Sequence, residues 1–280
     1  MRIGVHPNNL HLRLARLWPG SFAGFDREFV PYSEGRDTAS LLESGQIHFG
    51  GTGSTPPIEA DARGLGVRYI AASAPRPANG AIFVRADSDI RTVADLAGKR
   101  ISLVDGSFHT YLLAKSLEGE GFGLPDVTRV ESGDLDSLKE LLEKRVDGWV
   151  AMSPRLERVI DRKDLRLITR CGSTIPNRSL FWTLERHEFT VEAISTIVSE
   201  LDRIGREVTG DIRRAAELLA AEDGSEGDAA AWERVLRSRD FSVLPADDAI
   251  LAEQQAEADT LHRHGHFSGP VALKRPAELA

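Results

Sequence analysis

Short apolar runs alternate with segments of helical spacing over the first two thirds of the chain. The apolar runs predict strands at 2–5, 28–32, 47–49, 68–74, 81–84, 100–104, 146–150, 166–169 and 180–184. Helical spacing between them predicts helices at 10–18, 38–43, 56–63, 92–98, 109–118 and 136–144. This alternation with short loops is typical of the α/β class, in which helices cover a mainly parallel sheet.

The chain becomes helical after Thr190. A long helix is predicted there because apolar residues recur at helical spacing, at Val191, Ile194, Ile197, Leu201, Ile204 and Val208. Further helices are predicted at 211–222, 228–237 and 246–264, and Gly265 stops the last of them. With 280 residues, the chain can form one two-lobed unit or two domains.

A glycine-rich loop follows the apolar run at 47–49. Its sequence at 50–54 is GGTGS, and a helix that opens with prolines follows directly. Unpaired N–H groups and the helix dipole make the start of a helix after a strand a binding place for anions. The same arrangement recurs at 103–110. The two loops together predict a ligand cleft that closes from both sides.

The candidate ligand-binding residues of the first loop are Thr52, Gly53 and Ser54. Their hydroxyls and N–H groups can hold an oxygen of a sulfonate, carboxylate or phosphate without a full positive charge. The alternative is that the glycines only make the turn while Ser54 or Thr55 caps the following helix.

The candidates of the second loop are Ser107, Phe108 and His109. Ser107 could cap the helix while N–H groups there bind an anion, and His109 could donate to that anion or act as a neutral specificity group. The alternative is simple capping by Ser107 next to an exposed His109.

Three polar residues follow the first strand, at the edge where open α/β sheets place their ligands. They are His6, Asn8 and Asn9. One asparagine is expected to cap the helix at 10–18, which leaves the other and His6 for a ligand.

Trp149, Met152 and Pro154 lie at the end of the strand at 146–150. They could form an apolar wall around the organic part of a ligand, although Trp149 could equally belong to the core. Trp182 could serve in the same way.

The composition limits the classes of function. A net charge of −8 argues against general binding to nucleic acid or anionic membranes. The single cysteine, Cys171, excludes an internal disulfide and a cysteine metal cage. His262, His264 and His266 straddle a helix end, where favourable charge explains them better than metal binding does. We therefore expect no metal and no cofactor.

Several segments resemble one protein family. The first is SGQIHFGGTGSTPPIEADARG at 44–64, similar to its strand–glycine–helix element. The second is AIFVRADSDIRTVADLAGKRISLVDGSFHT at 81–110, and the third is RVDGWVAMSP at 145–154. Gln254, Gln255 and Asp259 before a His-Gly stop resemble its last helix. The chain thus resembles the solute-binding proteins of nitrate, sulfonate and taurine ABC importers.

The resemblance implies the type II periplasmic-binding-protein fold, with two lobes of mixed sheets flanked by helices and a hinge of two crossovers. Lobe 1 would hold 1–84 and 186–280, and lobe 2 would hold 85–185. A monomer is expected to capture a small organic anion, sulfonate-like or carboxylate, between the lobes for an ABC permease. The ligand could also be a nitrate-like anion, an aromatic acid or a thiamine-precursor pyrimidine.

Two alternatives place the chain in the cytoplasm, as an enzyme or as a sensor on the same fold. Sulfinate desulfinases are relatives of this family and use a cysteine nucleophile after the first strand. This chain has His6-Pro7 in that region, so an enzyme here would lack that nucleophile. The residues favour a binding protein over an enzyme. A transport component would be periplasmic or lipid-anchored, but the start MRIGVHPNNL lacks the features of a secretory signal, which keeps the cytoplasm open.

Overall fold

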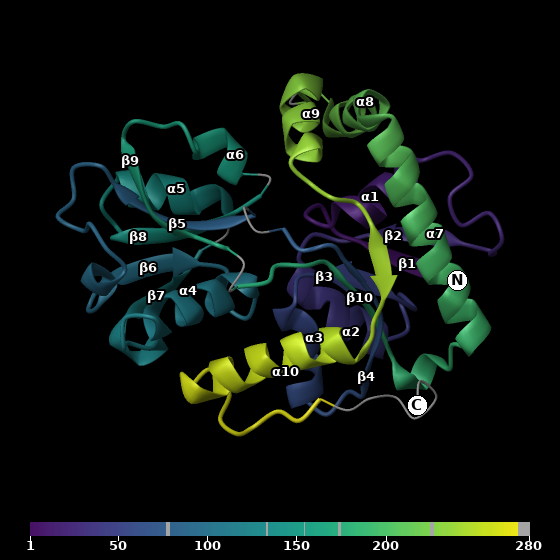
Figure 1. Cartoon of the computed structure of the whole chain (residues 1–280), viewed down its shortest axis with the longest axis horizontal. Coiled ribbons are helices and arrows are strands. Elements are labelled where there is room, and N and C mark those ends of the chain that lie inside the picture. The colour runs from purple at the N-terminus through teal and green to yellow at the C-terminus, as the bar shows by residue number, and fades with distance from the viewer. Residues whose placement is uncertain (77–78, 133, 154, 173–174, 225–226, 274–280) are drawn as a thin grey trace. The chain divides into compact units, whose positions relative to one another are not determined.

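The computed structural model describes residues 1–76, 79–132, 134–153, 155–172, 175–224 and 227–273 (Figure 1). The chain divides into two compact units. Unit 1 contains Met1–Pro75, Arg178–Ala252 and Leu273, and unit 2 contains Arg76–Asn177 and Glu253–Ala272. Each unit is thus assembled from segments that are far apart in the sequence. The lobe boundaries given above stay a prediction.

Unit 1 contains two small sheets. The first pairs β1 (Arg2–Val5) with β2 (Glu28–Pro31) in parallel. The second has the order β11 (Val243–Pro245), β4 (Val67–Ser73), β10 (Leu180–Leu184) and β3 (Gly50–Thr52), and all neighbours in it are antiparallel. The expectation of a mainly parallel sheet is therefore wrong for this unit. The reason is that β10 enters from a distant part of the chain and runs against both β4 and β3.

The helices of unit 1 differ in what they bury: each α-helix buries apolar residues, whereas the two 3-10 helices bury none. They are α1 (Leu10–Leu17), α2 (Thr38–Glu43), α3 (Thr55–Ala62), α7 (Val191–Gly210), α8 (Ile212–Asp223), α9 (Ala229–Arg237) and the 3-10 helices η1 (Gly35–Asp37) and η4 (Glu185–His187). The helical spacing predicted for α7 is confirmed from its second turn on, since Ile197 and Leu201 are buried. Val191, the first residue of the helix, is exposed although it was predicted on the same face. Burial of a side chain such as Ile197 contributes about 1.5–3 kcal/mol.

Unit 2 is built on one mixed sheet. Its order is β7 (Thr128–Glu131), β6 (Arg100–Leu103), β8 (Gly148–Met152), β5 (Gly80–Arg85) and β9 (Leu165–Arg170). β6 runs parallel to both its neighbours, whereas β5 runs antiparallel to both of its own. The prediction of mixed sheets flanked by helices is confirmed.

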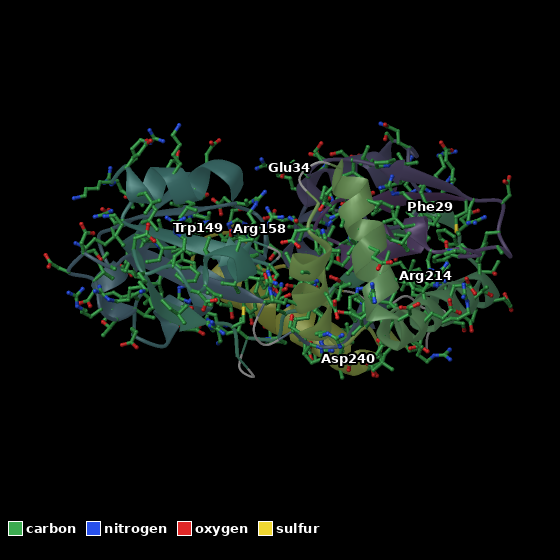
Figure 2. All side chains as sticks on the ribbon, turned by 90° about the horizontal axis from the view of Figure 1, so that it is seen from above. Phe29, Glu34, Trp149, Arg158, Arg214 and Asp240 are labelled. Carbon is green, nitrogen blue, oxygen red and sulfur yellow. The ribbon has the colours of Figure 1, made fainter. Side chains whose placement is uncertain are left out.

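The helices of unit 2 include one that starts in unit 1. They are α4 (Phe108–Glu118), α5 (Asp134–Leu142), α6 (Leu156–Val159), the 3-10 helices η2 (Ala94–Leu96) and η3 (Leu124–Asp126), and most of α10 (Asp248–Arg263). Trp149, labelled in Figure 2, is 1% exposed and packs with Phe83 in the core of this unit.

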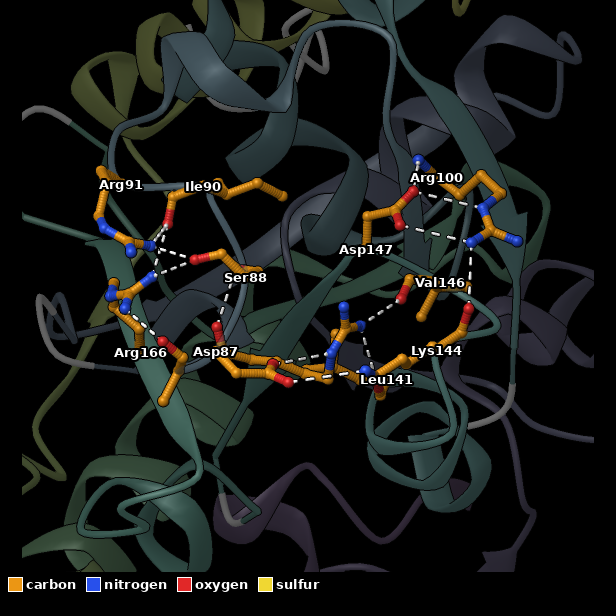
Figure 3. Close-up of polar contacts among 12 residues, drawn as sticks. Asp87, Ser88, Ile90, Arg91, Arg100, Leu141, Lys144, Val146, Asp147 and Arg166 are labelled. Carbon is orange, nitrogen blue, oxygen red and sulfur yellow. Dashed lines mark hydrogen bonds and ion pairs between the residues drawn. The ribbon is translucent and has the colours of Figure 1, made fainter.

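Arginines fix the loops at one edge of the unit 2 sheet (Figure 3). Arg166 on β9 donates to the carbonyl oxygens of Ser88 and Ile90 in the loop after β5, at 3.2 and 2.8 Å. Arg100, at the start of β6, contacts the carboxylate of Asp147 with its backbone N–H at 2.9 Å and its Nε at 3.3 Å. These contacts lie at the amino end of β6.

Four short elements depart from the sequence-based expectations. The strand expected at 47–49 lies instead at β3, because Phe49 makes only an isolated parallel bridge to Ile3 before the ladder with β10 begins. The strands β7 and β11 and the helix α6 were not predicted. Each has at most four residues, too few to show a period.

Candidate functional site

The candidate site of unit 1 lies where β1 and the chain leading into β3 end. β1 bridges Phe49 in parallel, so His6 and the glycine-rich loop lie at the same edge. A Cβ placed on Gly51 would be 2.4 Å from Nδ2 of Asn9 and 3.0 Å from Leu12 and Phe181. Only glycine therefore allows the Asn9 amide to lie against this strand.

The two asparagines have different roles. Oδ1 of Asn9 accepts a hydrogen bond of 3.0 Å from the N–H of Leu12 and caps α1. Its Nδ2 is buried and has no hydrogen-bond partner among the described residues. Asn8 is exposed, and its N–H faces Nδ1 of His6 at 3.4 Å. Asn9 thus caps the helix and also presents an unpaired donor, whereas the prediction assigned these two tasks to different residues.

The hydroxyls of Thr52 and Ser54 differ in whether they have hydrogen-bond partners. Oγ1 of Thr52 donates to the carbonyl of Gly53 at 2.8 Å and accepts from Nε1 of Trp182 at 2.9 Å. Ser54 lies at the N-cap of α3 but makes no capping bond there. Its Oγ is buried and has no partner among the described residues. The capping alternative for Ser54 is therefore wrong.

The start of α3 offers fewer backbone donors than an ordinary helix. Pro56 and Pro57 occupy its first turn and carry no N–H. Any anion at this helix start would therefore depend on the amides up to Thr55 and on the hydroxyl of Ser54. Gly53 is half-buried, which leaves the loop partly accessible.

The candidate residues at α4 in unit 2 mostly have hydrogen-bond or packing partners within the protein. Ser107 Oγ donates to the carbonyl of Val104 at 2.6 Å and accepts from the N–H of His109 at 3.2 Å, which makes it a helix cap. Phe108 is buried and packs against Tyr111, with the centroids of the two rings 5.7 Å apart.

His109 is buried, so the alternative that left it exposed beside a capping Ser107 is wrong for this residue. Its Nδ1 faces the N–H of Val104 at 3.4 Å and accepts from it. Burial lowers the pKa of His109 to about 4, and the charge of Arg155 adds to this effect. His109 is therefore neutral at pH 7 and does not attract an anion by charge.

The proposed apolar wall is only partly described. Trp149 and Trp182 are both core residues, and Trp182 is fully buried. Met152 is half-buried, and its sulfur lies 2.7 Å from the place of a Cβ on Gly80. Pro154 lies outside the described residues.

Asp105 was missed by the sequence analysis. Its Oδ1 accepts from the N–H of Gly106 at 3.1 Å, from Oγ1 of Thr110 at 2.7 Å and from Nη1 of Arg129 at 2.7 Å. An Asp-Gly pair directly before a helix cap was the available indication.

Cys171 has the properties of a structural thiol. It is buried, and burial raises its pKa to about 12. Only the thiolate is an effective nucleophile, so this thiol is poorly suited to nucleophilic chemistry at neutral pH. In the part of the chain that the structure describes, no group of three or more His, Cys, Asp or Glu could hold a metal ion.

Comparisons with known proteins bear on the family and on the fold. The sequence profile of the NMT1/THI5-like family matches residues 22–169, which is more than half of the chain. The chain therefore belongs to the NMT1/THI5-like family. A relative in Escherichia coli (strain K12), whose name is that of an aliphatic sulfonates-binding protein, is 25% identical over 214 residues, or 74% of this chain and 67% of that protein.

Two solved structures have a similar architecture. The alkanesulfonate-binding protein SsuA from Xanthomonas axonopodis pv. citri, bound to MOPS, has a TM-score of 0.86 and 26% identity, covering 97% of this chain and 95% of its own. The periplasmic aliphatic sulphonate binding protein SsuA from Escherichia coli has a TM-score of 0.85 and 23% identity, covering 97% and 94%. The predicted periplasmic-binding-protein fold is confirmed. Within the described residues, no helix is both long and apolar enough to cross a membrane.

Proposed function

We propose that this chain is the solute-binding protein of an ABC importer and that it captures a small organic anion, sulfonate-like or carboxylate. It would act outside the cytoplasm and deliver the ligand to a permease. Membership of the NMT1/THI5-like family and the names of the relatives support a solute-binding role. The names of those relatives refer to aliphatic sulfonates and alkanesulfonates, which supports the choice of an anion.

The observation that carries the proposal is the buried hydroxyl of Ser54, which has no hydrogen-bond partner in the part of the chain that the structure describes. A buried polar group without a partner destabilises a protein by about 1–3 kcal/mol, so such groups tend to serve a function. An anionic oxygen that accepts the Ser54 proton would offset this loss.

A second unpaired donor supports an anion at the same edge. Nδ2 of Asn9 is buried against Gly51 and, as an amide nitrogen, it can complete its hydrogen bonding only with an acceptor; the Ser54 hydroxyl can donate to the same kind of group. Neutral donors of this kind bind an oxyanion without a compensating positive charge. The net charge of −8 is therefore no obstacle.

Calorimetric titration of the purified chain tests the proposal. The probes are MOPS, short alkanesulfonates, carboxylates of matched chain length, nitrate and an aminopyrimidine. We expect saturable binding of at least one organic anion, and recovery of that anion unchanged after incubation. Conversion of the probe would show an enzyme instead, and binding of the pyrimidine alone would contradict the anionic ligand.

A further inference from the structure

Arg13 joins the beginning of α1 to two other helices of unit 1. It lies one turn after Asn9, and its backbone N–H donates to the carbonyl of Asn9 at 2.9 Å. Its Nε and Nη2 donate to the carboxylates of Glu222 and Asp223, the last two residues of α8. The side chain of Arg13 is only 9% exposed, so these charge-assisted bonds are largely shielded from solvent.

Trp232 on α9 completes this contact. The guanidinium of Arg13 lies over its indole ring, 5.0 Å from the ring centroid. Nε1 of Trp232 donates to Oδ2 of Asp223 at 2.7 Å, so the indole also fixes the carboxylate that Arg13 binds. The buried leucines of α1 resist separation of the helix from the core, but apolar contacts have no direction and allow small rotations or shifts. Arg13 adds directional contacts to fixed partners.

The position of α1 decides where the side chain of Asn9 lies. Oδ1 of Asn9 caps the helix, so its amide group moves with the first turn. Nδ2 is buried, has no hydrogen-bond partner among the described residues and leaves no room for a Cβ on Gly51. A hydrogen bond weakens steeply when its length or angle leaves the favourable range. A small displacement of α1 would therefore suffice to misplace this donor.

We propose that Arg13 is a positioning residue for anion binding, which fixes α1 against α8 and α9 and thereby holds Nδ2 of Asn9 in place. Arg13 acts only through Asn9 and contacts no ligand. The inference rests on the proposed function, since it assumes that the Asn9 donor binds the anion. Every residue of this network belongs to unit 1. Arg16 also contacts Glu222, but it makes no described contact with Asp223.

A double-mutant cycle tests whether Arg13 acts through Asn9. Arg13→Met removes both ion pairs but keeps an unbranched side chain over Trp232. Asn9→Ser removes the amide donor, while serine still caps a helix well. Calorimetric titration of the anion that the wild type binds best should give a Kd about fivefold higher for Arg13→Met. In the Asn9→Ser background the same change should raise Kd by less than about twofold, whereas in the Ser54→Ala background the full effect should remain.

The matched control is Arg214→Met, at the opposite end of α1. The guanidinium of Arg214 on α8, labelled in Figure 2, lies 5.1 Å from the ring centroid of Trp18, the C-cap residue of α1. Both variants thus lose an arginine that stacks on a tryptophan at the helices around α1. Only Arg13 is next to the turn that holds Asn9, so Arg214→Met should leave Kd at the wild-type value.

The side-chain NH2 signals of Asn9 report the position of this amide without a ligand. They are assigned by their absence from the heteronuclear NMR spectrum of Asn9→Ser. We expect them to shift or broaden in Arg13→Met and to keep their wild-type positions in Arg214→Met. Should Arg13→Met fail to fold, Arg13→Lys keeps the positive charge but loses the fork that bonds two carboxylates. Arg13→Lys should change Kd and these signals in the same direction.

The outcomes separate this inference from the proposed function. An unchanged Kd in both Arg13→Met and Arg13→Lys overturns the positioning role. An equal rise in Kd with and without the Asn9 amide also overturns it, because Arg13 would then act by another route. If the wild type binds none of the anions, the proposed function fails. Unchanged Asn9 signals in the Arg13 variants would even then overturn the placement of this amide by Arg13, and shifted signals would support it.

Discussion

Nε1 of Trp182 donates a hydrogen bond of 2.9 Å to Oγ1 of Thr52, across a sequence separation of 130 residues. This bond ties β10 to the end of β3, inside the four-stranded sheet of unit 1. It also occupies the Thr52 hydroxyl, whose proton goes to the carbonyl of Gly53. Of the two hydroxyls in this loop, Ser54 is therefore the one available to a ligand.

Removal of the Ser54 hydroxyl should mainly affect anion binding, whereas removal of the Thr52 hydroxyl should mainly affect stability. Ser54→Ala should weaken anion binding by about tenfold to a hundredfold, because it removes a hydrogen bond to a charged group worth about 1.5–3 kcal/mol. It should not lower the free energy of unfolding of the ligand-free protein, since that hydroxyl loses no hydrogen bond to any described residue. Titration calorimetry and urea denaturation give the two quantities.

Thr52→Val is the matched control for Ser54→Ala. It leaves the buried indole N–H of Trp182 without its acceptor and should destabilise the protein by about 1–3 kcal/mol. Its effect on affinity should be the smaller of the two. A reversed pattern, with affinity lost only in Thr52→Val, would remove Ser54 from the site.

Gly51→Ala tests the close contact that orients Asn9. The added methyl group would lie 2.4 Å from Nδ2 of Asn9 and 3.0 Å from Leu12 and Phe181. Overpacking of this kind costs about 1–3 kcal/mol, and the displaced amide should also weaken anion binding. Gly24→Ala is the control, because Gly24 is exposed with no atom near the added Cβ. Thermal unfolding of both variants checks the difference, and equal Tm values would contradict it.

The sequence pattern predicted those elements that contain enough residues to show a period. The strand at 180–184 and the helix at 38–43 have the predicted bounds, and α7 buries the predicted face apart from Val191. The pairing between strands could not be predicted from the sequence pattern, because the insertion of β10 between β4 and β3 depends on contacts between distant segments. The short strand β11 ends in Pro245, a residue that argues against a strand.

The sequence predicted where the candidate site lies, but not which of its polar groups have hydrogen-bond partners. The glycine-rich loop and the polar residues after β1 do share one edge, as the alternation of strands and helices implied. Which hydroxyl is free was not readable, because it depends on the indole of Trp182. Likewise, only the packing of Asn9 against Gly51 shows that one asparagine both caps α1 and keeps an unpaired donor.

His109 predicts a loss of stability in mild acid. Its pKa is about 4 in the folded protein because of burial, against 6.5 for an unperturbed histidine. Between these values the unfolded chain binds the proton and the folded protein does not. The free energy of unfolding should therefore fall as the pH drops from 6.5 towards 4, by up to about 3 kcal/mol.

The control for this prediction is His109→Asn, whose side-chain oxygen can still accept from the N–H of Val104. Other groups also titrate in this range, so the quantity to compare is the difference between wild type and variant. Urea denaturation at pH 7 and pH 4.5 measures it. A wild type that loses no more stability than His109→Asn over this interval would show that His109 does not remain neutral in the folded protein.

The buried thiol of Cys171 predicts slow chemistry in the native state. With a pKa of about 12, it holds very little thiolate at pH 8, whereas an unfolded cysteine near pKa 8.5 is partly ionised. Alkylation by iodoacetamide should therefore be slower in the native protein than in the denatured protein by about 10³-fold or more. Ser44→Cys in a Cys171→Ser background supplies an exposed thiol as reference, since position 44 is exposed. Rapid native labelling of Cys171 would reveal an accessible thiolate, and it would reopen the case for a cysteine-dependent enzyme.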